Sequence, residues 1–314
     1  MNPLKIIYKA LIPEGIRIRI WTALRGFPAR WRLLTQTLRY RASRKTFHRR
    51  ATILFYPERP RISAFAIIKI CRLSGHRIST DPSQPYDLAI YWEDVTWRKP
   101  DAVLNAIEQR GRCINGACVD ISKKHVQNIF QEVFGYPLAV EPLTAQGDCV
   151  KKSNINFKHD GQVIRCPVSA IEPDYVYQKL INNRRADNLV EEIRVPIFAD
   201  RIPFVCLKYR HVNDRFQNYF RATIKPSVDI FSANEISLIQ RFCARLKLDY
   251  GELDILRDND DGRIYIVDAN TTPSGPPRHL PAREEWQAVR LMAETFADVF
   301  LNKDGNWKHR ADCG

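Results

Sequence analysis

The chain has 314 residues, of which 45% are hydrophobic and 27% charged, and its formal net charge at pH 7 is +14. A chain of this length and composition can bury a sizeable core, which excludes a disordered protein and predicts two or three compact lobes. No apolar run approaches the roughly 18 residues that a membrane-spanning helix needs, so the sequence predicts a globular protein without such a helix.

The eight cysteines are scattered along the sequence, and none forms a CxxC pair or a Cys/His pair at a metal-binding spacing. Several lie within apolar runs, where a reduced cysteine behaves as a small core residue. No signal peptide with a small-residue cleavage site is evident. We therefore expect reduced thiols and a cytoplasmic location.

Residues 1–50 are strongly basic, with 13 of the 49 Lys and Arg residues but only one of the 35 acids. Isoleucines, leucines and tryptophans alternate there with arginines, which predicts a basic amphipathic arm broken near Gly26 and Pro28. Such an arm can lie on an anionic membrane surface. The alternatives are an acidic partner, nucleic acid, an Arg-rich targeting peptide, or an arm that packs its apolar side on the protein itself. No RNP, zinc-finger or helix-turn-helix signature supports the nucleic-acid alternative.

Residues 51–120 alternate between strand and helix patterns. Strands are expected at 51–56 and 87–92, and helices at 63–73 and 102–109. This alternation favours a parallel sheet with helical crossovers. The segment has no GxGxxG motif, so it gives no support for a dinucleotide site.

Ser122 is a predicted N-cap, and the helix that follows has apolar residues at helical spacing up to Gly135. Short strands separated by turn residues come next, a pattern typical of an antiparallel sheet. They are expected at 149–151, 156–158, 163–167, 175–181, 190–199 and 202–210.

A capping box of Ser232 and Glu235 begins another amphipathic helix. This helix leads into two strands, 253–257 and 263–270, which are joined by an acidic turn. The turn does not match a calcium-binding EF-hand loop, because its glycine is fifth instead of sixth and Ala269 stands at position twelve. A rigid loop at 274–277 and a closing helix at 283–301 are expected to follow.

The most informative polar residues lie on these two strands. Asp268 and Asn270 are two residues apart and so share one face of the second strand, which we expect to carry Ile264 and Ile266 as well. Asp254 on the first strand should lie opposite or diagonal to Asp268, within roughly 5 to 8 Å. Two carboxylates and an amide are hard oxygen ligands suited to Mg²⁺, which completes its shell with water and substrate phosphates. The alternative is a surface hairpin with solvated acids.

An Asp, a hairpin and then acid-x-Asn-x-x-Pro resembles the metal-binding end of ATP-grasp enzymes, and the upstream segments follow in that family's order over about residues 51–300. The resemblance implies an α/β and α+β protein, in which a small Rossmann-like lobe precedes two lobes that sandwich a nucleotide. The implied domains are an arm at 1–50, the Rossmann-like lobe at 51–120, an ATP-grasp domain at 121–302 and a tail at 303–314. Within the ATP-grasp domain, residues 148–180 with neighbouring strands would form the small lobe and residues 181–302 the large lobe.

The resemblance also implies which lysines contact ATP phosphates. Lys123, with Lys124 as the fallback, matches the lysine at the start of a helix that reaches the phosphates. Lys151 matches the lysine that ends the first strand of the small lobe. Lys152 is then expected to point the other way.

Further ATP contacts follow from the same resemblance. The linker whose backbone reads the adenine edge would be formed by Gln178, Lys179, Leu180 and Ile181. Glu192 falls where an acid often binds the ribose hydroxyls. Arg194 and Lys208 are candidates to neutralise phosphates.

Two features depart from the family's pattern. Residues 152–156 contain no glycine, whereas many members carry a glycine-rich loop that covers the phosphates there. Glu252 stands where many members place an arginine near the developing oxyanion. Arg210, Arg221 or Arg257 would have to take that catalytic role.

The function implied by the resemblance is that of an ATP- and Mg²⁺-dependent ligase, which activates a carboxylate as an acylphosphate and couples it to an amine or similar nucleophile. The substrates would be small-molecule, peptide or glycan carboxylates and amines, and the basic arm would allow peripheral contact with a membrane. One alternative is a phosphotransferase of the same fold. Another is a non-catalytic nucleotide-binding module whose arm binds membrane or nucleic acid.

Overall fold

The computed structural model describes residues 50–61, 64–158 and 160–302. The predicted basic arm, apart from Arg50, and the tail at 303–314 lie outside the described residues. Within the described part of the chain, no helix is both long enough and apolar enough to cross a lipid bilayer.

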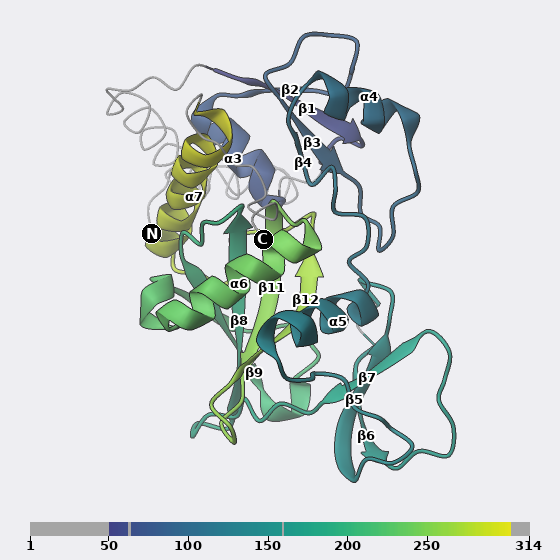
Figure 1. Ribbon diagram of the computed structural model, residues 1–314. Helices are drawn as coiled ribbons and strands as arrows, with labels where there is room; N and C mark the ends of the chain where they lie inside the picture. The colour runs from purple at the N-terminus through teal and green to yellow at the C-terminus, as the bar shows by residue number, and fades with distance from the viewer. Residues whose placement is uncertain (1–49, 62–63, 159, 303–314) are drawn as a thin grey trace, which may run out of the picture. The chain divides into compact units, whose positions relative to one another are not determined.

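The first sheet has four strands, all parallel, in the order β2-β1-β3-β4 (Figure 1). Its elements are β1 (Thr52–Pro57), α3 (Ala66–Ser74), β2 (Arg77–Ser79), β3 (Leu88–Trp92), α4 (Ala102–Arg110) and β4 (Cys113–Ile114). Gly75 ends α3 in the left-handed conformation, and the Asp101 side chain caps α4 by accepting from the N–H groups of Val103 and Leu104. The predicted parallel sheet is confirmed. We call this part, residues 50–115, the parallel-sheet lobe.

The large sheet has five antiparallel strands in the order β10-β9-β8-β11-β12. Its strands are β8 (Leu189–Phe198), β9 (Val205–His211), β10 (Arg221–Lys225), β11 (Tyr250–Arg257) and β12 (Ile264–Asn270). Apolar side chains such as Leu253 and Ile255 pack with α5 (Lys123–Phe134) and α6 (Ala233–Leu246) in the main core. The predicted capping box of Ser232 and Glu235 begins α6. Because the helices take one face of this sheet, its polar side chains are left for the other.

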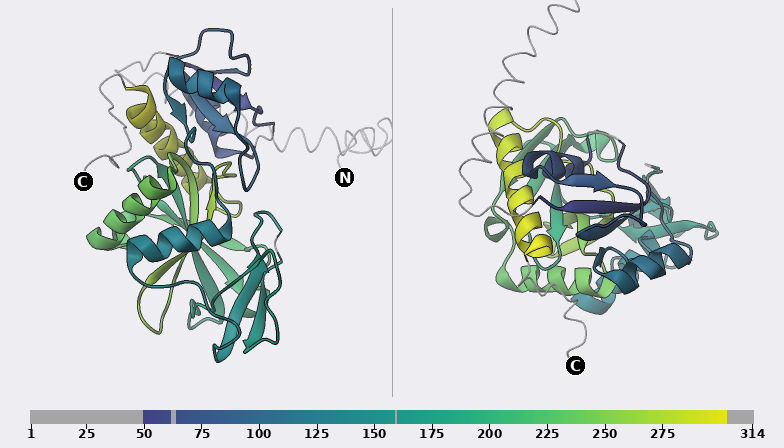
Figure 2. Two further views of the ribbon diagram at one scale, coloured as in Figure 1. Left: turned by 45° about the vertical axis from the view of Figure 1, so that its right-hand side comes forward. Right: turned by 90° about the horizontal axis from the view of Figure 1, so that it is seen from above.

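The small sheet has three antiparallel strands in the order β6-β5-β7 (Figure 2). They are β5 (Gly147–Ser153), β6 (Gln162–Cys166) and β7 (Tyr175–Lys179). The strand predicted at 156–158 is wrong, because these residues belong to the loop between β5 and β6. One face of the small sheet is buried in a cluster around Cys149, Cys166 and Tyr177. The remaining elements are α7 (Ala282–Phe296), which packs against α3, two 3-10 turns (Val212–Asp214 and Ser227–Asp229) and a π turn (Ala297–Leu301).

A bulge interrupts the hairpin formed by β11 and β12. Asp254 pairs with Asp268, but the next residue, Ile255, pairs with Ile266, so Val267 is an extra residue on β12. Paired residues point to the same face of a sheet, so Ile266 lies with Ile255 on the helix-covered face. The prediction that Ile264 and Ile266 share a face with Asp268 is therefore wrong. The extra residue reverses the alternation between them.

Hydrogen bonds connect the parallel-sheet lobe to the start of β11. The Asn115 side chain, which follows β4, accepts from the N–H groups of Asp249 and Tyr250 and donates to the Tyr250 carbonyl. The Asn115 N–H donates to the Asp249 carboxylate at 2.8 Å. All of these groups are buried. A second connection is the N–H of Gly275, which donates to the Ala64 carbonyl.

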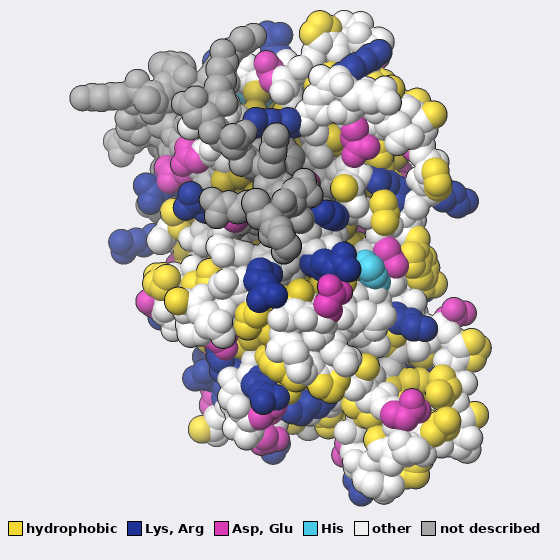
Figure 3. Space-filling view, viewed as in Figure 1, with side chains coloured by type: hydrophobic (Ala, Val, Ile, Leu, Met, Phe, Trp, Pro, Cys, Tyr) yellow, Lys and Arg dark blue, Asp and Glu magenta, His cyan; other side chains and the backbone are white. Residues whose placement is uncertain are grey.

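Charged side chains of both signs are interspersed over the face seen in Figure 3. Some of them join neighbouring helices, as in the ion pairs Arg245–Glu132 between α6 and α5 and Lys69–Glu285 between α3 and α7. The excess of positive charge in the sequence falls in residues 1–50 instead. Charge alone therefore marks no site on this face.

Candidate functional site

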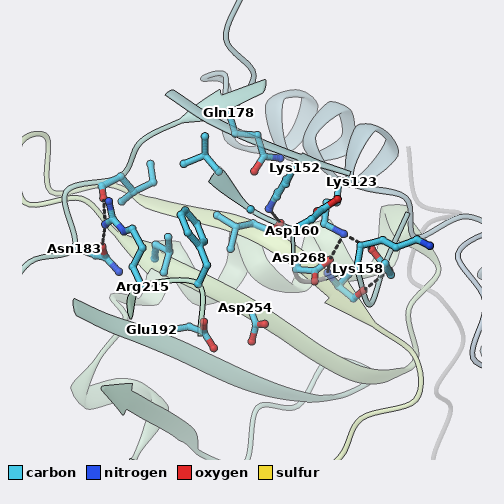
Figure 4. A pocket seen from close by; sticks show the side chains of 18 of the residues that line it. Lys123, Lys152, Lys158, Asp160, Gln178, Asn183, Glu192, Arg215, Asp254 and Asp268 are labelled. Atoms are coloured by element: carbon cyan, nitrogen blue, oxygen red, sulfur yellow. Dashed lines mark hydrogen bonds and ion pairs between the residues drawn. The ribbon is translucent and has the colours of Figure 1, made fainter. Parts of the chain in front are cut away.

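A cavity of about 280 Å³ lies between the small sheet and the polar face of the large sheet. The loop after β5 and the first residue of α5 complete its wall (Figure 4). Most residues predicted to bind ATP or metal line this cavity. They are Lys123, Gln178, Lys179, Leu180, Ile181, Glu192, Arg194, Asp254, Asp268 and Asn270.

The floor of the cavity is the face of the large sheet that the helices leave free. Alternation along β8 and β11 brings Glu192 and Arg194, and then Glu252 and Asp254, to this face. The register pairs Asp254 with Arg194 on the adjacent strand. Acids and bases therefore alternate across the strands, which keeps these partly buried charges paired.

Arg194 holds two of these acids. Its Nε and Nη2 donate to the two carboxylate oxygens of Asp254 at 2.9 and 3.1 Å, and its Nη1 donates to Glu252 at 3.1 Å. Burial raises the pKa of Glu252 to about 7, against the opposing effect of Arg194. Burial also opposes the charge on Arg194, but Asp254 and Glu252 outweigh it and raise the arginine's pKa.

Glu192 is held in the same way from β9. Lys208 and Arg210 contact its carboxylate at 2.9 and 2.8 Å. Burial would raise the pKa of Glu192, but Lys208, Arg210 and Arg194 outweigh burial and keep the pKa below its ordinary value. Lys208 itself is only 1% exposed and does not line the cavity, but its ammonium contacts Glu192 and Asp254, which do.

Two lysines meet Asp268 at the other side of the cavity (Figure 4). The Lys123 Nζ lies 4.0 Å from Asp268 Oδ1. The Lys152 Nζ donates to the carbonyl of Val267, the extra residue of the bulge, at 2.8 Å. Burial lowers the pKa of Lys152 to about 8, and it raises the pKa of Asp268.

The orientation predicted for Lys151 and Lys152 is the reverse of that in the structure. Lys152 lines the cavity, whereas Lys151 pairs with Glu172 and lies over the ring of Tyr175. Neighbours in a strand point to opposite faces, and Lys151 shares the face of Cys149, which is buried away from the cavity. The sequence analysis expected Lys151 to face the site, but Lys152 is the one of the two that lines the cavity.

The predicted metal ligands can be tested against the geometry. Asp254 and Asp268 are register partners on the cavity wall, and Asn270 lies beside them. The Asn270 amide oxygen accepts from the Thr272 N–H, and Arg194 occupies one side of the Asp254 carboxylate. Carboxylate oxygens have further lone pairs, so this donor set fits a hard divalent cation. Among the described residues, no group of three or more His, Cys, Asp or Glu side chains is placed to hold a metal ion, and Mg²⁺ typically uses one or two carboxylates with water and phosphate oxygens.

The predicted linker residues, 178–181, line the cavity, and the Gln178 side chain donates to the Gln127 side chain of α5 at 3.1 Å. The linker residue Lys179 donates its N–H to Leu138, and its ammonium pairs with Asp258 and Asp261 at 2.7 and 2.9 Å. Among the described residues, no hydrogen bond engages the backbone of Leu180. Leu180 itself lines the cavity.

Of the three arginines predicted near the oxyanion, only Arg210 lines the cavity within the described residues. Arg257 is bound to Glu235 and to the carbonyls of Ile230 and Gly262. Arg221 is exposed and lies over the ring of Tyr209. The geometry therefore separates Arg221 and Arg257 from the other predicted site residues.

The sequence analysis missed several residues that line the cavity. They come from the loops after β5 and after β9 and include Asn156, Phe157, Lys158, Asp160, Arg215 and Phe216. Arg215, for example, donates to the Ile181 carbonyl at 3.3 Å and to the Asn183 side chain at 2.8 Å. Loops have no periodicity, so the sequence carried no signal for which of their side chains would face the cavity.

No protein-family model matches the sequence, and no curated protein does. Solved structures do match. The ATP-grasp ligase PsnB in complex with a minimal precursor has a TM-score of 0.52 and 14% identity, covering 79% of this chain and 97% of that chain. PsnB in complex with a precursor peptide and AMPPNP has a TM-score of 0.50 and 13% identity, covering 78% and 96%. The chain therefore has the ATP-grasp fold.

Proposed function

We propose that this protein is an ATP-dependent ligase, which activates a carboxylate substrate with ATP in the cavity and couples it to an amine or similar nucleophile. The observation that carries the proposal is the pairing of Asp254 with Asp268 in a cavity that also holds Lys123, Lys152 and Arg194. Two carboxylates with cations around them suit a metal-bound triphosphate.

Each side of the cavity has a part in this proposal. The backbone of Leu180 and its neighbours would hold the adenine edge, and Glu192 would bind the ribose. Lys152 and Lys123 would neutralise phosphate oxygens. Asp254, Asp268 and Asn270 would hold Mg²⁺, which supplies further neutralisation of phosphate charge when bound.

The chain's own residues mainly orient groups and provide fixed charge. Arg194 fixes the Asp254 carboxylate by a two-pronged contact, so that carboxylate needs no reorganisation when a nucleotide binds. Arg210 is the remaining candidate to face the oxyanion as an amine attacks the activated carboxylate. A peptide is the first substrate class to test, because PsnB has been solved with a precursor peptide.

The decisive experiment measures ADP and inorganic phosphate released with Mg²⁺ present, using pools of carboxylates and amines that include acidic and amine-bearing peptides. A ligase releases ADP and phosphate in equal amounts and forms an amide product. A phosphotransferase releases ADP while the phosphate stays on the acceptor. If the protein binds nucleotide but shows no turnover with any pool, the result would favour the non-catalytic nucleotide-binding module instead.

Asp268→Asn is the matched variant for this assay. It keeps the size of the side chain and removes the charge expected at the metal, so turnover should fall at least about a hundredfold while the melting temperature changes little. Full Mg²⁺-dependent turnover by this variant would contradict the assignment of Asp268 as a metal ligand.

A further inference from the structure

The loop between β5 and β6 stands where a glycine-rich cover would be expected, yet the structure shows it tied down. The Asn154 N–H donates to the Asp174 carbonyl at 2.7 Å, and the Asn154 side chain accepts from the Lys124 N–H at 2.8 Å. Residues 155–158 that follow line the cavity. Phe157 adopts a positive φ of 63°, an unfavourable conformation for a bulky residue that neighbouring contacts have to hold in place.

Asn156 is the centre of these contacts. It is only 5% exposed. Its N–H donates to the Thr96 hydroxyl of the parallel-sheet lobe at 3.0 Å, and its amide nitrogen donates to the carbonyls of Ile121 and Ala269 at 3.1 and 3.4 Å. One side chain thus joins the loop to the segment before α5 and to the metal-site strand β12.

The remaining polar atom of Asn156 acts on Lys123. The Asn156 amide oxygen accepts from the Lys123 ammonium at 2.8 Å, and the Ile155 carbonyl accepts from it at 3.2 Å. An ammonium has three N–H donors, and the nearest charged group to the third is Asp268 at 4.0 Å. Figure 4 shows Lys123 beside Asp268 at the edge of the cavity.

A lysine whose side chain is already held in place loses less conformational entropy on binding an anion than a freely moving one. A lysine side chain that has to be ordered on binding loses rotamer freedom at that moment, which weakens affinity. Here the loop has already restricted Lys123, because two acceptors hold its ammonium before any ligand arrives. The same amide holds the Ala269 carbonyl, between the two residues predicted to bind metal on β12.

The geometry points to Asn156 as a positioning residue for the triphosphate, because it orients the Lys123 ammonium beside Asp268. This inference rests on the proposed function, since it assumes that phosphates bind at this end of the cavity. It predicts that Asn156 acts on nucleotide affinity through Lys123 and not only through the stability of the loop.

The test is a double-mutant cycle on the full chain. Dissociation constants for ATP with Mg²⁺ are measured by calorimetry for the wild type, Asn156→Ser, Lys123→Met and the double variant. We expect Asn156→Ser to weaken ATP binding about tenfold when Lys123 is present. In the Lys123→Met background the same substitution should change the affinity by less than about twofold, because the group it positions is gone.

Asn154→Ala is the matched control, because Asn154 lies in the same loop and its side chain contacts the backbone of Lys124 instead of the Lys123 ammonium. Its affinity should stay within about twofold of the wild type. Melting temperatures identify any variant that fails to fold. If Asn156→Ser does not fold, Asn156→Ala takes its place in the same cycle. Equal losses in both backgrounds would overturn the role of Asn156 alone. A wild type that does not bind ATP would overturn the proposed function and this role together.

Discussion

At the scale of single residues, the orientations of Lys151 and Lys152 determine which of the two side chains could contact a phosphate in the cavity. The two side chains leave β5 on opposite faces. Lys152 is half-buried and donates to the Val267 carbonyl in the cavity, whereas Lys151 is bound to Glu172 outside it. A half-buried ammonium near Asp268 loses fewer solvent contacts than an exposed one when an anion binds.

Lys152→Met should therefore weaken ATP binding by at least about tenfold, since it removes a charge-assisted contact to phosphate. Lys151→Met, at the neighbouring position, should change the dissociation constant by less than about twofold because its partner Glu172 lies outside the cavity lining. Calorimetric titration with ATP and Mg²⁺ checks both. A larger loss for Lys151→Met than for Lys152→Met would contradict this orientation.

The part of the site that lies within one hairpin could be predicted from the sequence, because local spacing determines which residues of adjacent strands meet. This is how Asp254 and Asp268 were placed together, although their binding of a metal stays a prediction. The two-pronged contact of Arg194 with Asp254, two residues 60 positions apart in sequence, depends on the register between β8 and β11. No local pattern specifies that register.

At the scale of elements, β11 and β12 approach each other unusually closely at Gly251. A Cβ atom added at Gly251 would lie 2.4 Å from the carbonyl oxygen of Asn270. The carbonyl oxygen belongs to the backbone and the backbone fixes the position of a Cβ, so neither can move without shifting a strand. The glycine thus allows the strand that carries Asn270 to lie where it does.

Gly251→Ala should lower the free energy of unfolding by about 2 to 4 kcal/mol, because the new methyl group forces the strands apart. Gly111→Ala is the control, since a Cβ there has nothing within 4 Å and the backbone is extended at φ 172°. It should change stability by less than about 0.5 kcal/mol. Urea unfolding of both variants measures the difference, and similar losses in the two would refute a steric role for Gly251.

The order of the long elements followed from hydrophobic periodicity and capping residues, as at Ser122 and Ser232. The strands β2, β4 and β10 escaped prediction. β2 and β4 have three and two residues, too few for a period to emerge, and both are defined only by pairing with a partner strand. The strand predicted at 156–158 was wrong for a related reason. A strand is defined by pairing with a partner strand, which the sequence does not show, and these residues pair with no strand.

At the scale of the whole molecule, the parallel-sheet lobe is joined to β11 through buried polar groups. Asp249 is an acid in this connection, and burial raises its pKa to about 7 despite the N–H of Asn115. The folded protein therefore retains this proton at pH values where the unfolded chain, with a pKa near 4, has released it. The connection is thus more favourable at acidic than at neutral pH.

Because the folded state binds the extra proton, the contribution of Asp249 to stability is complete below about pH 4 and declines as the pH rises to about 7. Asp249→Asn keeps the acceptor oxygen and removes the titration. Its free energy of unfolding, measured relative to the wild type by urea titration, should rise across this window by up to about 1.4 kcal/mol per pH unit. A difference that stays constant from pH 4 to pH 8 would show that Asp249 is ionised in the folded protein.

The bulge at Val267 has a consequence for how this chain can change over evolutionary time. Loss of that one amino acid would leave Ile266 opposite Ile255 and Asp268 opposite Asp254, as in an uninterrupted ladder. Loss of a residue farther from the bulge, such as Tyr265 or Ala269, would instead turn over the residue between it and the bulge, sending Ile266 toward the cavity or Asp268 into the helix-covered core. Relatives of this chain can therefore have a hairpin one residue shorter and keep Asp254 paired with Asp268, so their sequences should be aligned with a gap allowed at Val267.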